Sequence, residues 1–307
     1  MIIVSASDNN FVPGLFLLLY SAWLHNRQAK FFVIDAGMTP ERVVDLRKFC
    51  DTNGIVCQIV EAAGELISNL PTRGKPITTA AYARLLIPEI LAGHDKAIYL
   101  DADTLVLSDL SDLWSVDLGD NLVAGVVDGF VEQEELDDAQ LSRAEYINSG
   151  VLAMNLAAWR REGIADKIFS AIRTNERSRY LDQTIINTVA RGRIVFLDRA
   201  WNFFTERYAH SERRVPKVIH YAGSAKPWRY KGVPFAEVFD TYRIMSGSNI
   251  PAATDARKSR RMRKVLGLLA LRRKYWSRVS ASIYYQHRFI GPHLRNLGQI
   301  DRKRGSV

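Results

Sequence analysis

The sequence predicts an α/β domain built on a mixed, mainly parallel β-sheet. In the first half of the chain, short aliphatic runs alternate with longer segments of helical periodicity, the pattern of repeated strand and helix units. The 307 residues are 47% apolar and 24% charged, an ordinary globular composition that can bury a large core. This composition excludes a disordered chain, a collagen and a small disulfide-stapled protein.

Strands and helices follow one another along the first hundred residues. Ile2–Ala6 is an apolar run typical of a buried strand, and Pro40 opens a helical pattern that continues to Asn53. The other elements expected here are helices over Gly14–His25 and Thr79–Ile90 and strands over Lys30–Ile34, Val56–Val60 and Ala97–Leu100.

The second half continues the pattern with longer interruptions. The elements expected are strands over Val123–Val127, Gly192–Leu197 and Val218–Tyr221 and helices over Ile164–Arg173 and Asp182–Val189. The acidic stretch 132–138 predicts a solvated loop or helix face, and 146–155 combines a turn signal with a buried run. A linker beginning near Ser246 divides the chain into a domain over residues 1–245 and a tail over residues 246–307.

The net charge of +9 is concentrated in the tail. Residues 256–307 carry fifteen Lys and Arg against one acid, Asp301, so this segment is +14 and the rest of the chain is −5. Over Arg257–Tyr275 the apolar residues recur at helical spacing among basic ones, which predicts a basic amphipathic helix. The aromatic residues after it suit a membrane interface: Trp276, Tyr284, Tyr285 and Phe289. We expect an anionic membrane surface as the partner of residues 256–307; nucleic-acid binding and a helix packed on the domain are the alternatives.

Targeting and redox signals favour a cytoplasmic protein attached to the inner face of the membrane. Met1–Asp8 has no basic start, and the apolar stretch Phe11–Leu24 is shorter than the ~20 residues that span a bilayer. Cys50 and Cys57, the only cysteines, match no common metal spacing and are expected to be reduced thiols.

Asp101 and Asp103 are the leading candidates for chemistry. In an extended segment, residues i and i+2 project to one face, so the two carboxylates can bind one Mg²⁺ or Mn²⁺ ion just beyond a buried strand. His220 ends another apolar strand and offers a third ligand. Each feature also has a structural reading, a solvated turn for the aspartates and a hydrogen bond for the histidine. The sequence has no glycine-rich phosphate loop, so a nucleotide must be held by side chains and a metal.

Six motifs follow one another over about residues 1–235. They are Ser7-Asp8-Asn9-Asn10, Ala81-Tyr82-Ala83-Arg84-Leu85, Tyr99-Leu100-Asp101-Ala102-Asp103, Asn148-Ser149-Gly150-Val151, Asp182-Gln183-Thr184 and His220-Tyr221-Ala222-Gly223-Ser224-Ala225-Lys226-Pro227-Trp228. In this order they resemble the motifs of the retaining glycosyltransferases of family 8, most closely the bacterial lipopolysaccharide α-galactosyl- and α-glucosyltransferases. The resemblance implies a nucleotide-sugar-binding domain of the GT-A type.

The resemblance also implies a role for each site residue. The uridine and ribose of a UDP-sugar donor would be held by Ala6, Asp8 and Asn10, with Ala102 also among the nucleotide-binding positions. Mn²⁺, or Mg²⁺ in its place, would be coordinated by Asp101, Asp103 and His220. The diphosphate would meet Gly223 and Lys226, and the sugar hydroxyls Arg84, Asn148 and Asp182. Gln183, grouped with Asp182 as catalytic, would lie near the anomeric carbon.

The function expected is therefore retaining transfer of galactose or glucose from UDP to a saccharide such as lipopolysaccharide core, with no nucleic acid as partner. Two alternatives remain open from the residues alone. One is a non-catalytic protein that binds nucleic acid through the basic tail. The other is a nucleotidyl or phosphoryl transferase that uses the same metal.

Overall fold

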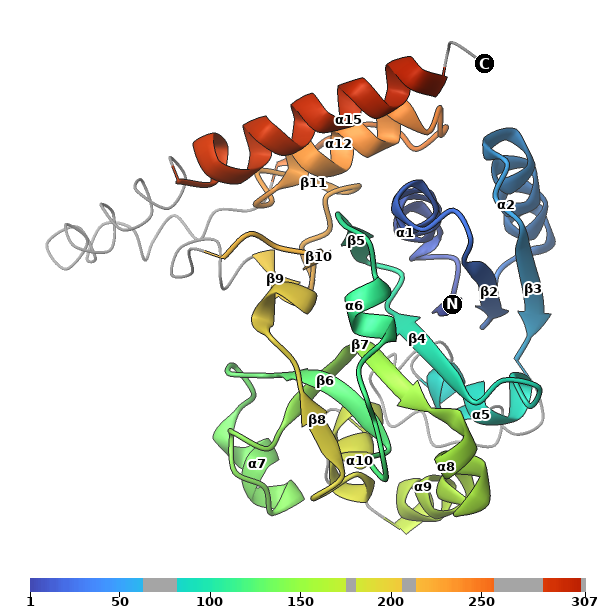
Figure 1. Ribbon diagram of the computed structural model, residues 1–307, viewed down its shortest axis with the longest axis vertical. Coiled ribbons are helices and arrows are strands. Elements are labelled where there is room, and N and C mark those ends of the chain that lie inside the picture. The colour runs from blue at the N-terminus through green and yellow to red at the C-terminus, as the bar shows by residue number, and fades with distance from the viewer. Residues whose placement is uncertain (63–81, 175–180, 206–213, 257–283, 305–307) are drawn as a thin grey trace, which may run out of the picture.

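The computed structural model describes residues 1–62, 82–174, 181–205, 214–256 and 284–304 (Figure 1). Its centre is a seven-stranded sheet in the order β3-β2-β1-β4-β7-β6-β8. The strands are β1 (Ile2–Ser7), β2 (Lys30–Asp35), β3 (Cys57–Glu61), β4 (Lys96–Leu100), β6 (Val123–Val127), β7 (Ile147–Asn155) and β8 (Ile194–Phe196). Only β7 runs antiparallel to its neighbours in this sheet. The predicted mixed, mainly parallel sheet is confirmed.

Helices cover both faces of this sheet (Figure 1). On one side, α1 (Val12–His25) and α2 (Pro40–Asn53) share a hydrophobic cluster with the sheet. The same cluster extends outward to α12 (Ala236–Met245), which contacts α1, and to α15 (Gly291–Arg304), which contacts α12. The other face packs against α5 (Ile87–Ile90), α8 (Leu156–Arg161), α9 (Ile164–Thr174) and α10 (Leu181–Val189). Alternate residues of β4 enter opposite layers, with Ile98 on the α1 side and Tyr99 on the α5 side. Both faces of the sheet are therefore buried, which explains the continuous apolar runs in the sequence.

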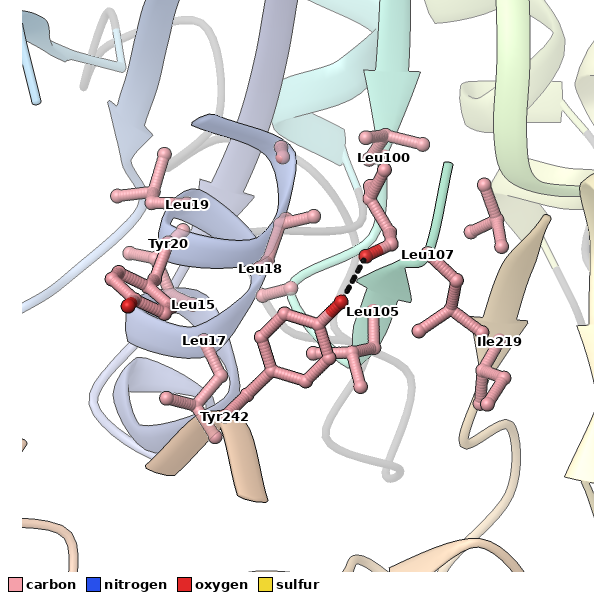
Figure 2. Close-up of a cluster of buried hydrophobic side chains, with 14 of the residues drawn as sticks. Leu15, Leu17, Leu18, Leu19, Tyr20, Leu100, Leu105, Leu107, Ile219 and Tyr242 are labelled. Carbon is pink, nitrogen blue, oxygen red and sulfur yellow. Dashed lines mark hydrogen bonds between the residues drawn. The ribbon is translucent and has the colours of Figure 1, made fainter. Parts of the chain in front are cut away.

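A second, three-stranded sheet joins distant parts of the chain. Its order is β5-β10-β9, formed by β5 (Thr104–Val106), β9 (Phe203–Phe204) and β10 (Val218–His220). β10 is antiparallel to β5, with His220 opposite Thr104. Figure 2 shows Tyr242 of α12 beside Leu105. The Tyr242 hydroxyl donates to the Val106 carbonyl at 3.4 Å. This small sheet brings the end of the folded domain back to the strand that follows the two aspartates.

The remaining short elements lie in the connections between these layers. They are α6 (Ser111–Trp114), α7 (Gln133–Ala139), β11 (Tyr230–Lys231), β12 (Asp255–Ala256), two 3₁₀ turns at Arg84–Leu86 and Arg199–Trp201, and a π-helical turn at Gln286–Ile290. None of the described helices has both the length and the hydropathy needed to cross a bilayer.

Two local expectations were met in outline, and a third was wrong. The described part of the helix expected over Thr79–Ile90, residues 82–90, is helical throughout, with a 3₁₀ turn at Arg84–Leu86 before α5. The acidic stretch forms α7 with a solvated face, as expected, but its Glu135 is buried, where it accepts a hydrogen bond from Thr184. Residues 148–150 lie inside β7, so the turn signal there was misleading.

The C-terminal aromatic residues pack on the domain. Tyr285 and Phe289 are buried, and both contact Phe235, with ring centroids 5.1 and 6.0 Å from it. The expectation that these two rings face a membrane was wrong, because the hydrophobic core of the domain covers them. In Figure 1, α15 lies along α12. The amphipathic helix expected over Arg257–Tyr275 and the Trp276 ring lie outside the described residues.

Candidate active site

Polar residues from three strands meet at one edge of the main sheet. Asp101 follows β4 and Asp128 follows β6, and these strands are parallel, so their carboxyl ends share an edge. Asn148 lies near the start of the antiparallel β7, at the same edge. The Asp101 N–H donates to the Gly150 carbonyl at 2.8 Å and ties β4 to β7 there. Ligand sites of open α/β sheets form at this edge.

Asp101, Asp103 and His220 come together as predicted. Their three ligand atoms lie within 4.8 Å of one another. His220 Nε2 is 3.2 Å from Asp103 Oδ1 and 3.8 Å from Asp101 Oδ2. Two carboxylates and an imidazole are ligands that Mn²⁺ or Mg²⁺ accepts, so the donor set fits a divalent cation.

The other oxygen of each carboxylate has a cationic partner. Arg84 lies 3.0 Å from Asp101 Oδ1, which also accepts a hydrogen bond from the Tyr99 hydroxyl at 2.6 Å. Lys226 Nζ pairs with Asp103 Oδ2 and donates to the Tyr221 carbonyl at 2.8 Å. Burial alone raises the pKa of Asp103, but the nearby Lys226 and His220 outweigh it and hold this pKa well below its usual range. Asp103 is therefore a carboxylate at neutral pH.

Gly150 makes room for this cluster. A Cβ atom at this position would lie 2.4 Å from His220 Cε1 and 2.6 Å from Asp101 Oδ2. Contacts this short do not occur between real side chains, so any larger residue would displace one of the two ligands. The glycine of the Asn-Ser-Gly motif thus has a packing role beside the predicted metal ligands.

The cluster opens into a pocket of about 380 Å³. Its polar lining includes the three ligands together with Asp128, Asn148 and Gln183. Gln183 Oε1 accepts hydrogen bonds from Asn148 Nδ2 at 2.9 Å and from the Ser149 N–H at 3.2 Å, while Gln183 Nε2 donates to Asp128 Oδ2 at 3.3 Å. Gln183 and Asn148 therefore lie at the site as predicted, held in a fixed orientation.

Arg84 is also at the site, but buried beneath it. Besides its ion pair with Asp101, it donates to the carbonyl and hydroxyl oxygens of Ser149, each at 2.8 Å. In this structure its guanidinium supports the aspartate and the Asn-Ser-Gly segment. Contact between Arg84 and sugar hydroxyls stays a prediction.

The residues expected to hold the nucleotide form the loop after β1. Asp8 accepts from the Asn10 N–H at 2.9 Å, which shapes this loop, and Ala6 is buried in β1. Lys226 lies 5.2 Å from the centroid of the Phe11 ring, so this loop adjoins the predicted diphosphate contacts.

The segment between the two aspartates packs closely on α1. A Cβ on Gly14 would lie 2.4 Å from the carbonyl oxygen of Ala102 and 2.8 Å from the Trp228 ring.

Two further predicted residues differ in what the structure says of them. Gly223 lines the pocket, whereas the side chain of Asp182, in α10, lies outside the described part of the chain.

Sequence reasoning missed two residues of the site. Asp128 accepts from Gln183, and its position directly after a predicted strand was an available signal. Asn202 is fully buried and contacts His220 Nδ1 through Oδ1 at 2.8 Å. Nothing in the local pattern around Asn202 indicated this contact, because it depends on the pairing of β9 with β10.

Comparison with known families now decides the relationship. The family model described as glycosyl transferase family 8 matches residues 2–232, three quarters of the chain. The chain belongs to glycosyltransferase family 8. General stress protein A of Bacillus subtilis is 28% identical over 251 residues, which cover 74% of this chain and 87% of that protein. A putative glycosyltransferase of Haemophilus influenzae is 27% identical over 243 residues, covering 75% of this chain and 74% of that protein.

Solved structures agree with this assignment. The galactosyltransferase LgtC in complex with donor and acceptor sugar analogues matches with a TM-score of 0.69 and 27% identity, covering 86% of this chain and 99% of that one. An active-site mutant of LgtC, in which glutamate replaces a glutamine, matches with a TM-score of 0.68 and 28% identity, covering 79% of this chain and 95% of that one. The fold is therefore of the LgtC-like GT-A type, and this family 8 member is a glycosyltransferase that uses a sugar donor and a saccharide acceptor.

Proposed function

We propose that this family 8 enzyme transfers galactose or glucose from a UDP-sugar to a saccharide acceptor, lipopolysaccharide core in particular, with retention of anomeric configuration and with Mn²⁺, or Mg²⁺ in its place. The observation that carries the proposal is the Asp101, Asp103 and His220 cluster, whose ligand atoms lie within 4.8 Å of one another in the pocket that Gln183 also lines. A cation bound there would stabilise the negative charge that develops on the departing diphosphate. The similarity to LgtC, a galactosyltransferase by its description, supports the hexose donor.

Lys226 and Gly223 suit the diphosphate end of the donor. Gly223 lines the pocket, and Lys226 pairs with Asp103 and lies near Phe11 in the loop expected to hold uridine. An ammonium group held in place before the donor arrives stabilises charge on the leaving group without reorganising during the reaction. The two residues would thus orient UDP with its sugar toward Asn148 and Gln183.

Gln183 is suited to positioning and not to nucleophilic attack. Its Oε1 already accepts two hydrogen bonds, from Asn148 Nδ2 and the Ser149 N–H, so its lone pairs are occupied. We therefore propose front-face transfer. The bond from the anomeric carbon to the phosphate oxygen breaks, the acceptor oxygen bonds to that carbon on the same face, and its proton passes to the departing phosphate oxygen. Detection by mass spectrometry of a glycosyl adduct on Gln183 or Asp182 would contradict this mechanism.

The donor experiment tests the proposal directly. UDP release would be measured from a panel of UDP-hexoses, with Mn²⁺ present or chelated, for the wild type and for Asp103→Asn. Asp45→Asn, an exposed aspartate on α2, is the matched control. We expect release that is selective for one sugar, lost on chelation and in Asp103→Asn, and unchanged in Asp45→Asn. Release of pyrophosphate or phosphate in place of UDP, or nucleic-acid binding without any sugar transfer, would refute the proposal.

We further propose that the basic tail holds the enzyme on an anionic membrane at its cytoplasmic face. The support is the charge of +14 over residues 256–307. Deleting the whole tail is a poor test, because it would remove Tyr285 and Phe289 from the core. Exchanging the Lys and Arg residues of 257–274 for Gln leaves those rings in place and should abolish sedimentation with anionic vesicles while UDP release persists. Undiminished sedimentation would exclude this role for the charges.

A further inference from the structure

A continuous chain of side-chain hydrogen bonds runs from His220 to Asp128. Asn202 Oδ1 contacts His220 Nδ1 at 2.8 Å, and Asn202 Nδ2 donates to Asn148 Oδ1 at 2.9 Å. Asn148 Nδ2 then donates to Gln183 Oε1, and Gln183 Nε2 donates to Asp128 Oδ2. The chain therefore joins a predicted metal ligand to the residues on the far side of the pocket.

Backbone N–H groups fix the direction of every bond in this chain. The Gly150 N–H, which can only donate, points at Asn148 Oδ1 at 2.9 Å, and the Ser149 N–H points at Gln183 Oε1 at 3.2 Å. Both amides are thereby oriented. Because Asn148 presents an oxygen to Asn202, Asn202 must present its NH₂ group there and its own oxygen to His220.

This orientation decides the tautomer of His220. The ring nitrogen that faces Asn202 Oδ1 must carry a hydrogen, so Nδ1 donates. Nε2 is then the nitrogen available to the pocket: it donates to the Asp103 carboxylate when it carries a hydrogen and offers its lone pair to a cation when it does not. Nε2 is the nitrogen 3.2 Å from Asp103 Oδ1. Asn202 is fully buried and His220 is 4% exposed, so water does not compete for the Nδ1 contact.

We propose that Asn202 is a positioning residue of the cation site: it holds His220 in the tautomer that presents the Nε2 lone pair to a divalent cation, and it links that ligand through Asn148 to Gln183. The inference rests on the cation site of the proposed function. When a ring nitrogen of a histidine loses its hydrogen-bond partner, the side chain can change tautomer and its ring can rotate. Loss of such a partner to a metal-binding histidine weakens metal affinity by about 10- to 100-fold.

Two substitutions at this position separate positioning from folding. Asn202→Leu has a similar volume but no acceptor for His220 Nδ1. Asn202→Asp keeps an acceptor for His220 Nδ1, but its second oxygen replaces the NH₂ group that donates to Asn148 Oδ1. Both variants therefore lose the hydrogen bond to Asn148. Asn53→Ala removes another buried asparagine, at the end of α2, which donates to the carbonyls of Phe49 and Ser246, and it serves as the control for loss of a buried amide.

The readouts are Mn²⁺ affinity, followed by the EPR signal of the free ion, melting temperature and the ¹⁵N chemical shifts of the His220 ring in the Mg²⁺-loaded protein. We expect both Asn202 variants and Asn53→Ala to melt below the wild type. Only Asn202→Leu should lose Mn²⁺ affinity, by about 10- to 100-fold, and show a mixture of His220 tautomers. Wild-type affinity and a single tautomer in Asn202→Leu, or equal losses of affinity in both Asn202 variants, would overturn the inference. If the wild type itself binds no Mn²⁺ but still releases UDP, the cation site fails and the transferase assignment stands.

Discussion

Replacing Gly150 by alanine should damage the cation site through a single methyl group. The added Cβ would lie 2.4 Å from His220 Cε1, 2.6 Å from Asp101 Oδ2 and 2.9 Å from His220 Nδ1. Neither neighbour can move freely, because His220 is held by Asn202 and Asp101 by Tyr99. Overpacking a tight site costs about 1–3 kcal/mol. About 1.4 kcal/mol corresponds to a factor of ten in an equilibrium constant. If the strain is relieved by moving one of the predicted ligands, Mn²⁺ binding should weaken by about 5- to 150-fold.

The assay combines Mn²⁺ titration followed by EPR with thermal unfolding of the metal-free protein. Gly93→Ala is the matched control, because a Cβ on Gly93 meets nothing within 4 Å. We expect Gly150→Ala to lose Mn²⁺ affinity, UDP release and several degrees of melting temperature, while Gly93→Ala keeps all three. If Gly150→Ala kept the affinity and melting temperature of the wild type, the close approach of His220 and Asp101 to this residue would be disproved.

Two further predictions concern the packing of the C-terminal residues. Burial lowers the pKa of His25 and of His293 to about 4 from 6.5, so both are neutral in the folded protein and become charged on unfolding below pH 6.5. Their contribution to stability is complete above pH 6.5 and is lost as the pH falls toward 4, at up to about 1.4 kcal/mol per pH unit for each. Urea unfolding at pH 7, 6 and 5 should show this slope, and the double variant with Gln at both positions should flatten it; an unchanged slope would contradict the burial of the two rings. Phe289→Ala should lower the free energy of unfolding by about 3–5 kcal/mol in guanidinium titrations. A loss below about 1 kcal/mol, like that expected for the exposed Arg288→Ala, would show that this ring does not pack on the domain.

The fold was largely readable from the sequence because its strands are buried on both faces. A run such as Val123–Val127 contains no polar side chain and therefore fits a buried strand and not a solvent-exposed one. The structure gives this strand the expected bounds. The errors fall where local pattern and tertiary contact disagree. Residues 148–150 have turn-forming side chains, but they belong to β7, where Asn148 pairs with Val126 of β6 and the pairing shifts register before Leu152. Phe289 reads as an interfacial aromatic, yet Phe235 and its neighbours provide a site on the domain that only the tertiary structure reveals.

The sequence predicted those residues of the candidate site whose side-chain type alone indicates their chemistry. Asp101, Asp103 and His220 suggest a cation by residue type, and the structure brings them together. Asn202 carries no such signal, because its function depends on which atom of which neighbour its amide meets. Those contacts arise from strand pairing between segments that are distant in sequence. Residues that act through another residue are therefore the part of a site that sequence patterns miss.

The charges around the cluster lead to a last prediction, on how metal and donor bind together. Arg84 and Lys226 balance the charges of Asp101 and Asp103, so of the three aspartates that line the pocket only Asp128 adds to its net charge. A divalent cation alone adds two positive charges to a partly buried site, and the diphosphate of a UDP-sugar compensates them. Mn²⁺ and UDP should therefore raise each other's affinity by the same factor.

Lys226→Met tests this charge balance, with Lys217→Met, which removes a cation paired with Asp112, as control. Two unit charges about 5 Å apart interact by about 3 kcal/mol at an effective dielectric constant of ~20. This energy exceeds the about 1.4 kcal/mol of a tenfold change, so removing the ammonium group should strengthen the binding of Mn²⁺ alone by at least about tenfold. It should also weaken the binding of UDP, and the mutual enhancement between them should shrink. Titrations of Mn²⁺ with and without UDP measure all three quantities. If Lys226→Met instead binds Mn²⁺ more weakly than the wild type, the main task of Lys226 is to hold Asp103 in place, and repulsion between the ammonium group and the cation is not what couples metal to donor.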